Sequence, residues 1–148
     1  MTQSLWTAVD DYMVSALSPS DPVLDKALVE TKTGGLPAIN VAPNQGKLLQ
    51  LLAQMIGARR ILEIGTLGGY STIWMARALP ADGWLVSLEF SPKHAEVARA
   101  NIARAGLKVP VEVRVGPALD SLPGIEADAT APFDLVFKIG RASCRERV

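Results

Sequence analysis

The chain has 148 residues, of which 49% are hydrophobic and 20% charged, and its 15 basic and 15 acidic side chains give a formal net charge of zero. This length and composition predict one soluble domain with a sizeable core, and a balanced charge without a basic block argues against nucleic-acid binding. No apolar run is long enough to span a bilayer, and Asp10 and Asp11 interrupt the apolar N-terminal pattern, so we expect a cytoplasmic protein without signal peptide or membrane contact.

Three helices are expected before the first strand. Apolar residues at helical spacing predict a helix over residues 3–17, and Pro22 begins a second helix that ends near Thr31. A polar, turn-rich segment at 39–46 leads into a third helix. We expect these helices to pack on one face of a sheet and to cover its ligand.

The segment RILEIGTLGGYST, residues 60–72, predicts a strand, a glycine-rich turn and a helix. Residues 61–64 form a short apolar run typical of a buried parallel strand, and a helical pattern runs from Tyr70 to Leu79. Backbone N–H groups at the start of such a helix face a ligand that glycine lets approach closely. We interpret the turn as a cofactor site; the alternative is a turn that only closes a tight corner.

The glycine spacing fits neither of two common phosphate-binding loops. The dinucleotide pattern G-x-G-x-x-G needs glycines where the chain has Leu67 and Tyr70. The phosphate loop G-x-x-x-x-G-K-[ST] needs a lysine that is missing here. Glu63 stands two residues before the first glycine. An acid at this strand end suits a ligand with an ammonium or sulfonium charge better than one with a pyrophosphate.

Strands and helices continue to alternate after the turn. Strands are expected at 84–88, 111–115 and 133–137, a helix capped by Ser91 at 92–105, and a short helical turn after 116–119 followed by a polar insert at 124–132. The pattern predicts an α/β fold with a doubly wound sheet.

Glu89 ends the second strand, 24 residues after Gly65, where a carboxylate can bind the hydroxyls of an unphosphorylated ribose. The alternative is an ordinary exposed acid.

The chain resembles the S-adenosylmethionine-dependent O-methyltransferases of the caffeoyl-CoA and catechol type over residues 36–137. The resemblance is carried by LPAINVAPNQGKLL, RILEIGTLGGYSTIWMARALP, LEFSPKHAEVARANIARAGL, VEVRVGPALDSLP and FDLVF. It implies the class I methyltransferase (Rossmann-like) fold and methyl transfer to a hydroxyl of a small catechol-like or acyl-CoA-linked phenolic substrate. It also implies Mg²⁺ or a similar divalent metal in the full-length enzyme, whose relatives are often homodimers.

The resemblance also implies contacts with S-adenosylmethionine at seven positions. These are Val41 at the methionine part, Glu63 at the end of the first strand, the backbone of Gly65 and Thr66, Ser71 at the methionine carboxylate, Glu89 at the ribose and Ala118 beside adenine. No catalytic residue and no metal ligand is assigned. His94, the only histidine, is expected in a solvated position.

The resemblance ends at Phe137. There the family continues with a sequence like IDADK, whose first acid ligates the metal, whereas this chain ends in KIGRASCRERV. That tail matches the translation of a common short-read sequencing adapter. We predict that residues 1–137 are the N-terminal part of a single methyltransferase domain, that 138–148 are a non-native tail, and that the fragment is marginally stable and inactive. The alternative is a genuine basic tail that binds acidic partners.

Two other functions remain open. One is a dinucleotide-dependent oxidoreductase, although the third glycine of its fingerprint is missing. The other is a non-catalytic cofactor-binding module that acts through partners. The sequence does not identify the methyl acceptor.

Overall fold

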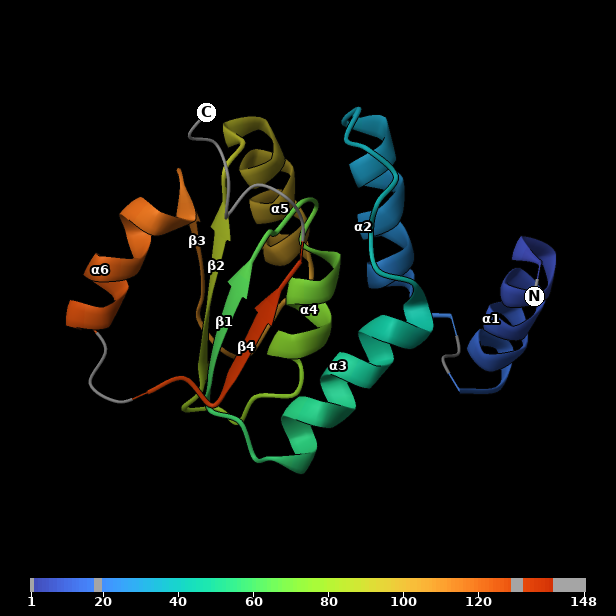
Figure 1. Ribbon diagram of the computed structural model, residues 1–148, viewed down its shortest axis with the longest axis horizontal. Helices are drawn as coiled ribbons and strands as arrows, with labels where there is room; N and C mark the ends of the chain where they lie inside the picture. The colour runs from blue at the N-terminus through green and yellow to red at the C-terminus, as the bar shows by residue number, and fades with distance from the viewer. Residues whose placement is uncertain (1, 18–19, 129–131, 140–148) are drawn as a thin grey trace.

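The computed structural model describes residues 2–17, 20–128 and 132–139. Its centre is a parallel four-stranded sheet in the order β3-β2-β1-β4, built from β1 (Arg60–Ile64), β2 (Trp84–Glu89), β3 (Val111–Val115) and β4 (Leu135–Lys138). Because the strands are parallel, their carboxyl ends meet at one edge (Figure 1). That edge is where open α/β sheets bind their ligands.

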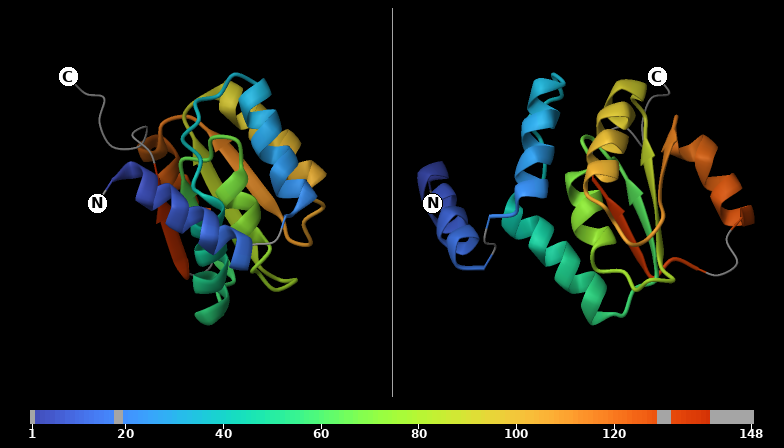
Figure 2. Two further views of the ribbon diagram at one scale, coloured as in Figure 1. Left: turned by 90° about the vertical axis from the view of Figure 1, so that its right-hand side faces the viewer. Right: turned by 180° about the vertical axis from the view of Figure 1, so that it is seen from behind.

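Helices cover both faces of the sheet, as the doubly wound prediction requires. Their bounds are α1 (Gln3–Leu17), α2 (Pro22–Thr33), α3 (Pro43–Met55), α4 (Tyr70–Ala76), α5 (Pro92–Arg104) and α6 (Ala118–Asp128). One face carries α6 and the other carries α4 and α5, with α2 and α3 as a further layer outside them (Figures 1 and 2). The predicted fold class is confirmed.

The core lies on the two faces of the central strands. Ile61 packs with Met75 and Leu85 on the side of α4, while Leu62 packs with Val86 and, from α6, Ile125 on the other side. Successive side chains of a strand point to opposite faces, so a strand that is buried on both sides needs a nearly continuous apolar run. The buried part of RILEI, residues 61–63, meets this requirement with one exception, the acid Glu63.

The expectation that all three N-terminal helices pack on the sheet is wrong for α1 and α2. The helix α2 packs on α4 and α5, whereas α3 reaches the core cluster of Ile61 through Ala53. The helix α1 does not cover the sheet. It packs beside α3 and lies outermost in the molecule (Figure 2). None of its residues is buried, and Tyr12 is 74% exposed. The reason is that α4 and α5 occupy this face of the sheet and α2 and α3 form the next layer, which leaves α1 only α3 to pack on.

Several boundaries also differ from the predicted ones. The third helix begins at Pro43, inside the segment expected to be a turn, and α4 ends at Ala76 instead of Leu79. The short turn predicted after residue 119 is instead the 11-residue helix α6, which runs through Pro123 and takes in the start of the expected polar insert. Burial of Ile125 in the core outweighs the low helix propensity of this segment.

The strand β4 starts two residues later than predicted and includes Lys138, the first residue of the predicted non-native tail. Ile139 continues the ladder, because its N–H donates to the carbonyl of Ile64 at 2.9 Å. Residues 140–148 lie outside the described residues. Over the part of the chain that the structure describes, no helix has the length and hydrophobicity needed to cross a membrane.

Candidate cofactor site

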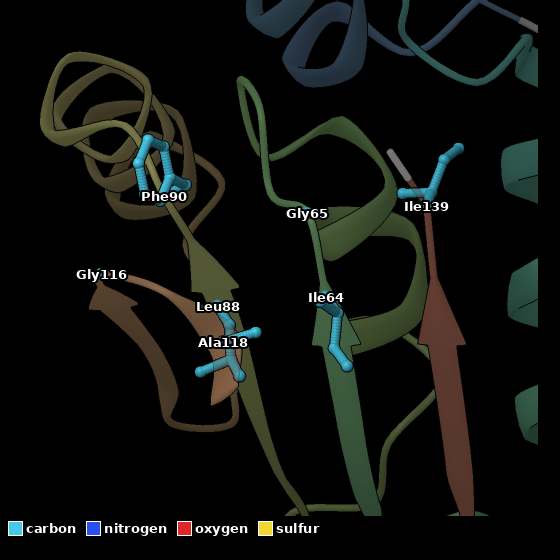
Figure 3. Close-up of a pocket in the computed structure, with 7 residues that line it drawn as sticks. All are labelled: Ile64, Gly65, Leu88, Phe90, Gly116, Ala118 and Ile139. Carbon is cyan, nitrogen blue, oxygen red and sulfur yellow. The ribbon is translucent and has the colours of Figure 1, made fainter. Parts of the chain in front are cut away.

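A cavity of about 270 Å³ lies beyond the carboxyl ends of β1 and β2. Three segments form its wall: residues 39–41 before α3, residues 65–71 after β1, and residues 89–94 after β2, joined by Ile139. A smaller cavity shares Gly65, Phe90 and Ile139 with it and reaches the ends of all four strands (Figure 3). The two cavities together occupy the position where a doubly wound sheet binds a ligand.

The turn between β1 and α4, residues 65–69, is called the glycine turn below. Gly65 and Gly69 have φ values of 102° and 82°, which favour glycine, and Leu67 has a φ of 51°. At Gly68 the constraint is space, because a Cβ atom there would lie 1.9 Å from the hydroxyl oxygen of Thr31 in α2. The glycines therefore let the chain turn sharply beneath the cavity and pack directly on α2.

Glu89 connects the end of β2 to this turn. Its Oε2 accepts hydrogen bonds from the N–H groups of Thr66 and Leu67 at 3.0 and 2.8 Å, and its Oε1 accepts one from the N–H of Ser91 at 3.0 Å. The residue is 5% exposed and lines the cavity, so it is not the ordinary exposed acid that was the alternative. A carboxylate held in this way can accept further hydrogen bonds from the hydroxyl groups of a ligand.

His94 lies beside Glu89 on the cavity wall, which differs from the solvated position expected for it. Its Nδ1 is 3.4 Å from Glu89 Oε1, and its side chain is 26% exposed. The cause is the start of α5: Ser91 caps the helix by accepting the N–H of His94, directly after β2 ends. The first turn of α5 therefore faces the cavity.

Glu63 lies beneath the site and lines neither cavity. It is fully buried and accepts hydrogen bonds from the hydroxyls of Ser71, Thr72 and Ser87, the last at 2.6 Å. Burial raises the pKa of its carboxyl to about 7, although the three hydroxyls act in the opposite direction. The visible role of Glu63 is to join β1 and β2 to the start of α4, and direct contact with a ligand stays a prediction.

The other six predicted residues lie on the cavity walls. The larger cavity is lined by Val41, Gly65, Thr66, Ser71 and Glu89, and the smaller one by Gly65 and Ala118. Sequence reasoning missed Asn40, Tyr70, Phe90 and His94, which also line the larger cavity. The first three are adjacent to a predicted residue, and His94 follows Glu89 by five residues. Proximity in sequence to Val41, Ser71 and Glu89 was therefore the available signal.

Asn40 supplies an independent indication of a ligand. Its Oδ1 atom is buried and has no hydrogen-bond partner among the described residues, and the residue lines the cavity. A buried acceptor without a partner costs about 1–3 kcal/mol. A ligand that donates a hydrogen bond would remove this cost.

The described residues do not fit the metal site of the family. They contain no group of three or more His, Cys, Asp and Glu side chains that could hold a metal ion. The resemblance places the first acidic ligand two residues after Phe137, where this chain has Ile139. An apolar side chain at this position cannot ligate a divalent cation.

Comparisons with known proteins agree on one family. Residues 14–141 match the family model described as O-methyltransferase, a match that crosses the predicted tail boundary at residue 138. The chain is 51% identical over 137 residues to a catechol O-methyltransferase of Niastella koreensis and 56% identical over 129 residues to one of Mycobacterium tuberculosis. These alignments cover 93% and 87% of the chain, and the chain spans only 62% and 57% of the two relatives.

A solved structure shares the fold. The O-methyltransferase of Bacillus cereus in complex with SAH is 55% identical and superposes with a TM-score of 0.88. The superposition covers 92% of this chain and 62% of the other.

Proposed function

Because the chain belongs to the O-methyltransferase family, we propose that its cavity binds S-adenosylmethionine and that the full-length protein transfers the methyl group to a hydroxyl of a small substrate. The observation that carries this proposal is the buried carboxylate of Glu89 on the cavity wall, tied to the glycine turn. The relatives support it, since one was solved in complex with SAH and two are catechol O-methyltransferases.

The residues of the two cavities suit the parts of the cofactor. We propose that Val41 and Ser71 hold the methionine end, that Gly65 and Thr66 contact it through their backbone, that Glu89 binds the ribose, and that Ala118 lies beside adenine. Ser71 stands in the first turn of α4, where helix N–H groups favour a carboxylate. When bound, S-adenosylmethionine supplies an activated methyl group, and the chain's own residues hold and orient it.

For the methyl acceptor we propose a catechol-like or acyl-CoA-linked phenolic compound. Divalent-metal assistance in the full-length enzyme stays a proposal from the resemblance.

Because Ile139 replaces the implied metal ligand, we propose that this chain binds the cofactor without turning over the substrate. An assay with catechol, S-adenosylmethionine and Mg²⁺ should give no methylated product, and product formation would contradict this proposal.

Calorimetric titration with S-adenosylhomocysteine (SAH) tests the cofactor assignment. We expect the folded chain to bind, and we expect Glu89→Ala to weaken binding at least tenfold by removing the ribose acceptor, roughly the effect of losing charged hydrogen bonds. Glu96→Ala is the matched control, since it removes an exposed acid of α5 that does not line either cavity. If the folded chain does not bind SAH, or if both variants bind equally, the assignment is wrong.

The other functions are less well supported. No relative reported above is a dinucleotide-dependent oxidoreductase, and NADH binding in preference to SAH would be needed to revive that function. A non-catalytic module would bind SAH equally well and would differ only in lacking activity in the full-length protein. The cytoplasmic location and the homodimer remain proposals that rest on the sequence and on the resemblance.

A further inference from the structure

Asn101 contacts the glycine turn, and no function assigned above involves it. It belongs to α5 and is 1% exposed. Its Nδ2 donates hydrogen bonds to the carbonyl of Gly68 at 2.9 Å and to the carbonyl of Ala27 at 3.3 Å. One side-chain amide therefore connects the glycine turn with α2.

The orientation of this amide is determined by a third contact. Asn101 Oδ1 accepts a hydrogen bond from Arg104 Nη1 at 2.7 Å, one helical turn further along α5. A guanidinium group can only donate, so the oxygen of the amide faces Arg104 and its NH₂ group faces the two carbonyls. Neither an aspartate carboxylate nor a leucine can supply these two donors.

The glycine turn needs such support because its backbone is strained. Leu67 has a positive φ, a conformation that non-glycine residues rarely adopt and that persists only where surrounding contacts impose it. Glu89 holds the turn from the cavity side through the N–H groups of Thr66 and Leu67. Asn101 holds it at a second point, through the carbonyl of Gly68.

The second hydrogen bond of Asn101, to the carbonyl of Ala27, connects the glycine turn to α2. Ala27 and Thr31 lie in α2, where the Thr31 hydroxyl donates to the same Ala27 carbonyl at 2.7 Å and lies against Gly68. Residues 39–41, which line the cavity, follow α2 in the chain after a short connection. Asn101 therefore fixes the glycine turn relative to the helix that precedes this part of the cavity wall.

We propose that Asn101 is a positioning residue, which sets the glycine turn against α2 and thereby determines how tightly the site holds its cofactor. The effect on affinity rests on the proposed function. The effect on the turn does not, because it can be measured without a ligand.

The test compares Asn101→Leu, which has a similar volume and no donor, with Val109→Ala. Val109 is buried in the core cluster of Ile61 and Met75, away from the glycine turn, so its truncation lowers global stability without touching the turn. The first measurement is hydrogen exchange of the Thr66 and Leu67 amides in the free chain, under conditions where both variants are folded. We expect exchange about tenfold faster in Asn101→Leu, the effect of one lost buried hydrogen bond, and wild-type exchange in Val109→Ala after correction for global stability.

The second measurement is the dissociation constant for SAH, which we expect to be raised about tenfold in Asn101→Leu only. Equal exchange in the two variants would overturn the proposal, and faster exchange with unchanged affinity would overturn its binding part. If Asn101→Leu does not fold, Asn101→Asp keeps the shape of the side chain and is used for the same comparison. If the folded wild-type chain does not bind SAH, the proposed function fails, while the exchange data still decide whether Asn101 positions the turn.

Discussion

Glu63 is the most unusual residue in the core, because a carboxyl group with no exposure to water lies between two central strands and a helix. Three hydroxyl donors satisfy its oxygens, and a hydrogen bond between Ser87 and Thr66 extends this network to the glycine turn. Burial nevertheless raises its pKa to about 7, so the carboxyl is mostly protonated below pH 7 and mostly ionised above it. The site therefore rests on a group that titrates near physiological pH.

This pKa predicts how stability depends on pH. Between the ordinary value of 4.5 and about 7 the folded chain retains a proton on Glu63 that the unfolded chain has released, so the free energy of unfolding falls as pH rises through this window. In Glu63→Gln this dependence is absent. We expect the stability of the variant relative to wild type to increase by about 3 kcal/mol from pH 4.5 to 8, measured by urea unfolding. Parallel pH profiles for the two proteins would contradict this prediction.

At Gly68 the prediction is steric. The Cβ of Gly68→Ala would overlap the hydroxyl of Thr31, a stiff β-branched side chain that is 1% exposed. We expect a loss of about 2 kcal/mol or more in the free energy of unfolding. Gly124→Ala is the control, because a Cβ meets nothing within 4 Å there and α6 should gain about 0.5–1 kcal/mol in helix propensity. Thermal unfolding of both variants tests this prediction. If Gly68→Ala and Gly124→Ala change the stability equally, or if Gly124→Ala is the more destabilising, Thr31 of α2 does not restrict the space at Gly68.

The strand β4 is held at its start by a side-chain hydrogen-bond acceptor, the carboxylate of Asp134. Asp134, just before β4, accepts hydrogen bonds from the N–H groups of Arg59 and Arg60 at 2.8 Å each. These backbone donors hold the pKa of its carboxyl below the usual value. The edge strand is therefore fixed at the amino end by a side chain and along its length by pairing with β1.

We predict that Asp134→Asn loses about 1 kcal/mol of stability at pH 7, because the amide oxygen is a weaker acceptor than the carboxylate. The pKa of Asp134 in the folded chain is lowered. Its contribution to the free energy of unfolding is therefore present above pH 3.8 and disappears as pH falls through the lowered pKa. Asp82→Asn is the control, since the pair of Asp82 with Arg59 is exposed and surface ion pairs contribute little. Chemical denaturation at pH 7 and pH 3 checks both statements, and a loss of the same size at both pH values would refute the role assigned to the charge.

At the scale of the whole molecule, cofactor binding and folding should be coupled. The cavity is built from segments that lie before α3, after β1 and after β2, so a ligand that spans them stabilises their arrangement. SAH at a hundredfold excess over its dissociation constant should add about 2.7 kcal/mol and raise the Tm of this chain by about 5–10 °C. NADH should give no shift, and Glu89→Ala should reduce the shift with SAH to about half or less, since a tenfold weaker site is still partly stabilised at this SAH concentration. A Tm shift with NADH that exceeds the shift with SAH would favour the oxidoreductase instead.

Features that depend on neighbouring residues could be predicted from the sequence. Apolar runs placed all four strands to within two residues, the glycines placed the turn, and the chemistry of the strand end singled out Glu89. These predictions succeeded because the pattern of a buried parallel strand and the constraints on a sharp turn are local. The same locality explains why six of the seven predicted site residues lie on the cavity walls.

Features that depend on residues far apart in the chain became visible only in the folded molecule. It placed Glu63 beneath the site, left α1 outside the sheet layers, extended α6 through Pro123, and brought Asn101 against the carbonyls of Ala27 and Gly68. None of these follows from spacing or propensity. Each results from which surfaces remain available once the sheet and its helices have packed, and this competition has no counterpart in a short stretch of sequence.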